Sequence, residues 1–275
     1  MSWIFTFQRI YDIFFRMFTI FSEIYKYRQM VFSLVHKELR GRYKGSVLGF
    51  FWTFLGPLLQ LIVYTFVFSI IMRQQIEKYY LFLFVALVPW IFISTCVSLG
   101  ANCVLIYGDL VKKIYFPREV LPISFVTSQF VNMLYTFVVI FAVIAFTRHG
   151  VNFHALLYLP VIMIVEYFLA LGITLLFSSL TVYVRDIAHI LGIVTMAWQF
   201  LTPVMYPSTM VPEKYLPLWN LNPMAHVIEA YRDILYFKKV PNLITLGSAV
   251  AMGCFFLVLG EFVFAKLQKG FAENL

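Results

Sequence analysis

The chain has 275 residues, of which 62% are apolar, 19% are aromatic and only 12% are charged. Soluble domains carry about a quarter charged and about half apolar residues, so this composition excludes a soluble globular enzyme and a disordered chain. It also excludes an outer-membrane barrel, whose alternating strands give only a weak hydropathy signal. The remaining class is an all-α, polytopic membrane protein.

Long uncharged runs separate the charged positions of the chain. A spanning helix needs about 20 apolar residues, and each of these runs is long enough to supply one. The runs predict six transmembrane helices, at residues 46–72, 79–99, 123–146, 155–180, 187–206 and 243–264. These helices belong to one transmembrane domain over residues 45–270, and a cytoplasmic tail follows at residues 271–275.

Residues 1–44 precede the first span and are predicted to form cytoplasmic interfacial and gate helices. In residues 1–28 the charged side chains fall on one side at helical spacing, which is typical of an amphipathic helix in the membrane interface. A second helix is expected to end near Arg42. Gly45 permits a sharp turn after it, and Ser46 can cap the next helix.

Five prolines follow one another closely from the end of the predicted fifth span onward: Pro203, Pro207, Pro212, Pro217 and Pro223. The uncharged stretch between Lys214 and Glu229 is too short to cross a membrane. Residues 208–239 are therefore predicted to form a short re-entrant helical segment before the last span. Irregular backbone at membrane depth is tolerated only where it is buried in protein or lines an aqueous path.

The net charge of +8 is unevenly distributed along the chain. Eight of the 21 Lys and Arg residues precede the first span, and with six spans both termini share the side that holds fourteen of them. The positive-inside rule then places both termini in the cytoplasm. Membrane anchoring accounts for these basic residues, so no nucleic-acid partner is predicted.

The sequence carries no recognisable catalytic machinery. No segment fits the phosphate-binding pattern G-x-x-x-x-G-K-[ST], so any ATP hydrolysis requires a separate polypeptide. The histidines are scattered, and the three cysteines fall within apolar spans. We therefore predict no catalytic residue, no metal site and no cofactor bound to this chain.

Glu166 is the one formal charge between His149 and Val184. An acid inside a span is costly and usually functional. Three interpretations are open: a titrating group in a proton-coupled carrier, a side chain that faces a water-filled path, or a bond to a neighbouring helix.

Charged and aromatic residues outside the apolar runs supply the other candidate sites. The predicted partner-contact residues are Asp109, Lys112, Lys113, Arg118, Arg185 and Asp186. The predicted gate residues, whose bases can meet an anionic lipid headgroup or simply anchor the chain, are Lys37, Arg40, Arg42 and Lys44. The aromatic candidates for a conduit wall, as an alternative to a membrane belt, are Trp52, Tyr64, Trp198 and Tyr206.

Several short segments carry a resemblance to a known family. They are Arg42-Tyr43-Lys44-Gly45-Ser46 with Gly49, Trp52 and Pro57-Leu58; Lys112 to Pro117; Val184-Arg185-Asp186-Ile187; Thr202-Pro203-Val204-Met205-Tyr206; and Asn222-Pro223 with Arg232-Asp233. Together with the six-span pattern, from about residue 30 to residue 270, they resemble the membrane subunits of polysaccharide-exporting ABC transporters.

The resemblance implies the permease of a type-2 ABC exporter in the bacterial cytoplasmic (inner) membrane. It implies a homodimer, two copies of a phosphate-loop ATPase subunit that bind ATP and Mg, and a pore between the two permease chains. The implied substrate is a lipid-linked glycan such as O-antigen, capsule or wall teichoic acid. The loop from Asp109 to Arg118 would be the main coupling helix, and the helices before the first span would gate substrate entry.

Other functions stay open at this point. The same fold can export a drug or a small lipid. A proton-coupled carrier would work alone and depend on Glu166. A membrane-embedded glycosyl- or acyltransferase is the weakest alternative, because the sequence lacks a catalytic His/Asp/Glu cluster.

Overall fold

The computed structural model describes residues 23–42 and 44–275 of the chain. Within these residues the chain forms helices joined by turns and loops, without a strand. The prediction of an all-α protein is therefore confirmed. Two predicted features fall largely outside the described residues: the amphipathic helix at residues 1–28, and Tyr43 in the segment before the first span.

The helices follow one another with short connections. The first half contains α2 (Arg28–Gly41), η1 (Gly49–Phe51), α3 (Trp52–Thr65), η2 (Phe66–Ile71), α4 (Tyr79–Ser98), η3 (Gly100–Asn102), α5 (Cys103–Ile106), α6 (Gly108–Lys113) and α7 (Val120–Phe146). The second half contains α8 (Phe153–Leu156), α9 (Leu159–Tyr183), α10 (Asp186–Leu201), η4 (Ser208–Met210), η5 (Glu213–Tyr215), α11 (Leu216–Trp219), α12 (Pro223–Leu235), α13 (Leu243–Leu267), η6 (Gln268–Gly270) and α14 (Phe271–Asn274).

Long apolar helices dominate the structure. Among the described residues, five helical stretches are long and apolar enough to cross a membrane: Gly49–Ile71, Tyr79–Lys113, Val120–Phe146, Phe153–Tyr183 and Leu243–Asn274. They overlap five of the six predicted spans and fit a polytopic membrane protein.

The sixth predicted span, at residues 187–206, overlaps the shorter helix α10, which has 16 residues and ends at Leu201. Thr202 is extended, with a ψ of 140°, because a residue before a proline is pushed out of the helical region and Pro203 follows. The predicted re-entrant segment, residues 208–239, contains the short elements η4, η5, α11 and α12. The six-span count and the re-entrant path stay predictions.

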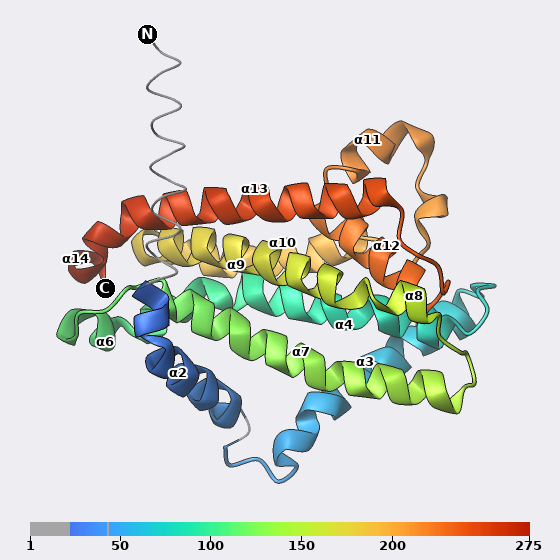
Figure 1. Ribbon diagram of the computed structural model, residues 1–275, viewed down its shortest axis with the longest axis horizontal. Helices are drawn as coiled ribbons and strands as arrows, with labels where there is room; N and C mark the ends of the chain where they lie inside the picture. Colours follow the sequence, from blue (N-terminus) through green and yellow to red (C-terminus); the bar gives the residue numbers. More distant parts are fainter. Residues whose placement is uncertain (1–22, 43) are drawn as a thin grey trace.

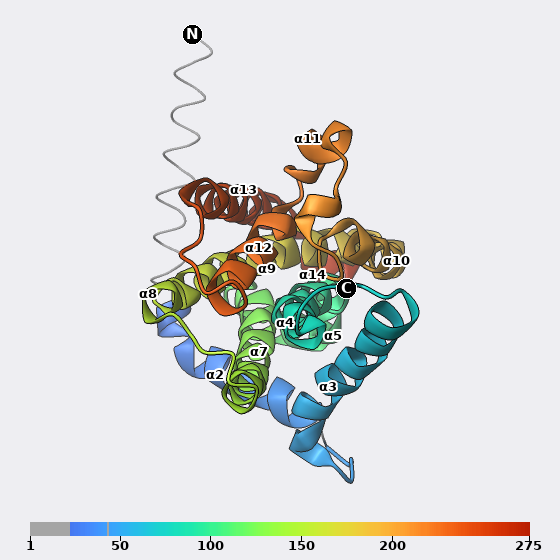
Figure 2. The same ribbon diagram turned by 90° about the vertical axis from the view of Figure 1, so that its right-hand side faces the viewer.

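Helix α4 forms the centre of the bundle. Figure 2 shows it in the middle, with α7, α9, α10 and α12 around it and α3 at the edge. Every residue from Leu81 to Trp90 is buried. A helix that is apolar all round has no polar face to turn toward water, so a central position suits it.

Helices α9 and α13 pack against each other through glycines. A Cβ atom at Gly260 of α13 would overlap the backbone of Gly172 in α9, and a Cβ at Gly172 would overlap the backbone of Phe256 and Leu257. Small residues let two membrane helices approach this closely and gain van der Waals contact. The pair therefore forms a fixed part of the bundle.

The bundle has two distinct ends (Figure 1). One end carries α6, α14 and the C-terminus, and we call it the α6 end. The opposite end carries α8 and α11, and we call it the α11 end. The turn between α9 and α10 lies at the α6 end, where the Tyr183 hydroxyl donates to the Leu267 carbonyl at 2.7 Å.

Candidate functional sites

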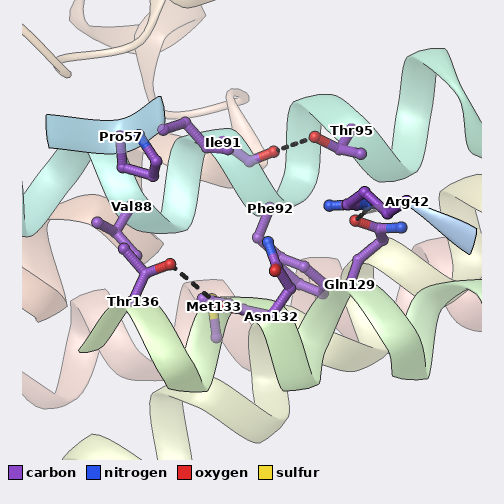
Figure 3. Close-up of a pocket in the computed structure, with 10 residues that line it drawn as sticks. All are labelled: Arg42, Pro57, Val88, Ile91, Phe92, Thr95, Gln129, Asn132, Met133 and Thr136. Atoms are coloured by element: carbon purple, nitrogen blue, oxygen red, sulfur yellow. Dashed lines mark hydrogen bonds between the residues drawn. The ribbon is translucent and has the colours of Figure 1, made fainter. Parts of the chain in front are cut away.

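A polar stripe on α7 faces a small pocket between α2, α3, α4 and α7. Gln129, Asn132 and Thr136 have the spacing i, i+3 and i+7, which puts them on one face of the helix. The pocket has a volume of about 40 Å³, and we call it the gate pocket. Figure 3 shows its lining, which includes Arg42, Pro57, Thr95, Gln129, Asn132 and Thr136.

Arg42 connects the end of α2 to this stripe. Its guanidinium donates to the Gln129 Oε1 atom across 2.5 Å (Figure 3). Arg42 is exposed, whereas Gln129 is buried. Polar residues inside a span are costly and mark functional paths. Sequence reasoning predicted Arg42 but missed the stripe, although its helical spacing within an apolar run was a usable signal.

A second contact joins α2 to the residue that precedes α6. The Tyr107 hydroxyl donates to the Glu38 carboxylate at 2.8 Å. The Lys37 ammonium lies 4.7 Å from the centre of the Tyr107 ring, which is a cation–π geometry. Helix α6 begins at Gly108, so these contacts of Tyr107 connect the start of α6 to α2. The other predicted gate bases, Arg40 and Lys44, are exposed.

The α6 end presents exposed charges of both signs. Asp109 lies in the first turn of α6, and Lys112 and Lys113 lie in its last turn. This arrangement complements the helix dipole. All three side chains are exposed, as are Arg185 and Asp186 at the start of α10. The end therefore offers a charged surface for a partner protein.

Arg118 differs from the other predicted docking residues because it already has partners within the chain. Its guanidinium donates to the Gln268 carbonyl oxygen and lies 5.8 Å from the centre of the Phe271 ring. The Gln268 amide donates to the buried Glu119 carboxylate at 2.6 Å. These contacts tie the loop after α6 to the C-terminal helix, so we expect Arg118 to hold the surface in shape.

Glu166 is completely buried between α9 and α12. The Tyr231 hydroxyl donates to its Oε2 atom at 2.6 Å, while the Oε1 atom has no hydrogen-bond partner among the described residues. The Tyr231 ring packs against Phe137 at a centroid distance of 5.7 Å. Of the three interpretations, the structure favours the bond to a neighbouring helix.

The four aromatic candidates do not form one wall. Trp52 donates to the Ser46 hydroxyl at 3.0 Å and is exposed. Tyr64 accepts a hydrogen bond from Gln199 across 3.3 Å, which joins α3 to α10.

Trp198 and Tyr206 do lie together. Both line a largely apolar cavity of about 770 Å³ at the α11 end. Trp198 donates to the Asn222 side-chain oxygen at 2.9 Å. This bond fixes one wall of the cavity to the start of α12.

Comparison with known proteins adds three relatives. The "O-antigen export system permease protein RfbA" of Myxococcus xanthus is 34% identical over 261 residues, which cover 94% of this chain and 100% of that protein. A Klebsiella pneumoniae protein of the same name is 32% identical, over 88% of this chain and 93% of that protein. The "Polysialic acid transport protein KpsM" of Escherichia coli is 22% identical, over 86% and 91%.

The family comparison covers most of the same region. The family described as ABC-2 type transporter matches residues 29–236, which include α2, the gate pocket, α6 and α12. The match extends over more than half of the chain, and the Myxococcus xanthus relative exceeds 30% identity over its whole length. The chain therefore belongs to the ABC-2 type transporter family.

Proposed function

We propose that the chain is the transmembrane subunit of an ATP-driven exporter that moves a lipid-linked polysaccharide, of the O-antigen or capsule type, across the bacterial cytoplasmic membrane. The observation that carries the proposal is the 34% identity to an O-antigen export permease over 94% of the chain. The five long apolar helices support a location in the membrane. The α6 end and both termini would then face the cytoplasm.

The energy would come from two copies of a phosphate-loop ATPase subunit that bind ATP and Mg. The exposed charges of Asp109, Lys112 and Lys113 on α6 support this end as the docking surface, together with Arg185 and Asp186. A push on α6 would reach α2 through the contacts of Tyr107 with Lys37 and Glu38. Helix α2 would thus act as a lever between the ATPase and the membrane.

Substrate would enter beside α2. The bases Lys37, Arg40, Arg42 and Lys44 supply positive charge for an anionic lipid headgroup. Arg42 lines the gate pocket, and a movement of α2 would separate it from Gln129. The glycan would then follow the headgroup into the space between two copies of the chain.

A homodimer accounts for the exposed apolar face of α3. Ile62 and Val63 of α3 are more than half exposed, as is Phe66 at the start of η2, and lipid or a second copy must cover them. A pore between two copies needs faces that the single chain leaves open, and α3 and α10 supply them. Wall teichoic acid or a small lipid could follow the same route.

A proton-coupled carrier is the second candidate, because Glu166 is a buried intramembrane acid with one oxygen lacking a partner among the described residues. The two candidates differ in their need for an ATPase.

The decisive experiment is purification of the tagged chain in mild detergent from its own cells, followed by mass spectrometry, an ATPase assay and transport in liposomes. A stoichiometric phosphate-loop ATPase and ATP-dependent export of lipid-linked glycan support the exporter. Transport by the chain alone, abolished by Glu166→Gln, would support the carrier instead.

A further inference from the structure

A cavity of about 320 Å³, lined by several polar and charged side chains, lies at the α11 end of the bundle. It is formed by α12, the start of α13 and η4, and we call it the exit pocket. Glu229, Arg232, Asp233, Asn242, Thr245 and Ser208 contribute to its lining. Its volume falls within the range of small-molecule sites, about 300–1,000 Å³.

Arg232 gives the exit pocket a rigid base. Its guanidinium donates to the carbonyl oxygens of Val204 at 2.7 Å and Tyr206 at 3.1 Å. It also lies 3.6 Å from the centre of the Phe82 ring. The side chain is only 3% exposed, yet its Nε atom has no hydrogen-bond partner among the described residues. A buried donor without an acceptor is costly, so a ligand oxygen at this position would stabilise the site.

Further polar groups of the lining are also uncommitted. The Glu229 carboxylate and the hydroxyls of Ser208 and Thr245 make no hydrogen bond or ion pair within the described part of the chain. Asn242 uses its side-chain oxygen to cap α13 at the Ile244 amide, over 3.0 Å. Its amide group therefore remains as a donor at the pocket.

The remaining lining balances charge and adds an aromatic face. Asp233 forms an ion pair with Lys239 at 3.2 Å, so neither carries an unbalanced charge. Arg232 and Glu229 also carry opposite charges and attract each other, although no ion pair joins them. Phe237, which is half exposed, borders the pocket. An isolated anion would meet two carboxylates here and an isolated cation would meet two bases, so the site suits a neutral polar ligand.

We propose that the exit pocket binds a neutral sugar unit of the exported glycan. Sugar hydroxyls both donate and accept hydrogen bonds, which matches a lining of carboxylate, guanidinium, amide and hydroxyl groups. The C–H face of a sugar ring packs against an aromatic ring such as Phe237. This inference rests on the proposed function, which supplies the glycan and places the α11 end on the exit side. Binding there would hold the emerging chain after it leaves the pore.

The test uses the full-length permease in lipid nanodiscs with its ATPase partner. The probe is the surface polysaccharide of the producing cells, freed from its lipid by mild acid and cut to short oligosaccharides. Its affinity is measured for the wild type, Glu229→Gln and Glu213→Gln. Glu213 is an exposed acid in η5 at the same end and does not line the exit pocket, so it serves as the matched control. Linear dextran oligosaccharides of equal length test selectivity.

We expect saturable binding to the wild type, about tenfold weaker binding to Glu229→Gln because a charged hydrogen-bond acceptor is lost, and no change in Glu213→Gln. Ser208→Ala provides a second, milder variant, with an expected loss of about threefold. The proposal is overturned if the wild type does not bind, if Glu229→Gln and Ser208→Ala bind like the wild type, or if dextran binds equally well.

ATPase co-purification and export of the lipid-linked polymer are measured on the same samples. They test the proposed function separately, since a permease can export normally and still fail to bind the free oligosaccharide.

Discussion

The α9–α13 pair and the α2–α3 region differ in how the chain holds them. At the α9–α13 contact, Gly172 and Gly260 leave no space for even a methyl group. In contrast, α3 exposes large apolar side chains such as Ile62 and Val63. Its neighbour α2 is held to the bundle by packing on α7 together with polar contacts of Arg42 and Glu38. The first region is held by close backbone packing, and the second by side-chain packing on α7 and by hydrogen bonds that can exchange for water.

This difference suggests a division of labour in the proposed exporter. A close backbone contact has no alternative arrangement that keeps its packing, because interiors are dense and tolerate little overlap. Hydrogen bonds at a helix end can exchange for water at little net cost. We therefore expect α9 and α13 to move as one body and α2 to move relative to it.

The largest effect is expected from Gly260→Ala in α13. Its added methyl group would overlap the backbone of Gly172, and a backbone clash cannot be relieved by a side-chain rotation. We expect a loss of about 3 kcal/mol or more in the free energy of unfolding, because such overpacking is costly. Thermal unfolding in detergent, followed by size-exclusion chromatography, measures it.

Gly247→Ala is the matched control, because a Cβ atom at Gly247 of the same helix meets no atom within 4 Å. It should leave stability unchanged or raise it slightly, since alanine favours helices. Equal stability of the two variants would show that α9 and α13 can separate, and the contrast with α2–α3 would be lost.

The next effect concerns the docking surface of α6. Reversal of three exposed charges, as Asp109→Lys with Lys112→Glu and Lys113→Glu, should weaken ATPase binding by at least about tenfold through charge mismatch. Co-purification and surface plasmon resonance at two salt concentrations measure the change. Lys214→Glu at the α11 end is the control and should bind normally. Intact binding and export by the triple variant would show that docking occurs elsewhere.

The sequence alone predicted which segments lie in the membrane better than it predicted which helices contact one another. Charged residues such as Lys44 and Arg73 bracket the apolar runs, so the positions of the long helices follow from hydropathy. Helix α10 ends at Leu201, inside the predicted span 187–206, because Pro203 keeps Thr202 out of the helical region. The close glycine contact was also missed, although glycine within an apolar span is a known packing signal.

Side-chain partners could not be predicted in the same way. Glu166 was identified as an unusual acid, but its partner Tyr231 lies 65 positions away. Arg42 was identified as a gate base, but Gln129 lies 87 positions away. An apolar helix such as α4 has no polar face, so hydropathy does not determine its rotation about its own axis. Contacts between distant helices therefore required the structure.

A moderate effect is expected from Tyr231→Phe. The variant keeps the ring contact with Phe137 but removes the hydroxyl that donates to Glu166. A buried carboxyl group would then lose its hydrogen-bond donor, at a cost of about 1–3 kcal/mol. Chemical denaturation of the wild type, Tyr231→Phe, Glu166→Gln and the double variant measures the coupling. Additive changes would mean that the hydrogen bond contributes nothing to the α9–α12 contact.

The smallest effect is expected from Gln129→Met, which removes the acceptor of Arg42 without a large change in volume. Arg42 is exposed and can turn to water, so we expect a cost of only about 1 kcal/mol, confined to the end of α2. Hydrogen exchange should accelerate about fivefold at residues 38–42 and stay unchanged in α9 and α13.

Tyr107→Phe should loosen the other contact of α2 by releasing Glu38, and the two changes together should release α2 further than either alone. Unchanged exchange in α2, or equal acceleration in α9, would mean that α2 belongs to the same rigid body as the α9–α13 pair. Helix α2 could then not move relative to the α9–α13 pair, and it could not transmit a movement of the ATPase to the gate pocket.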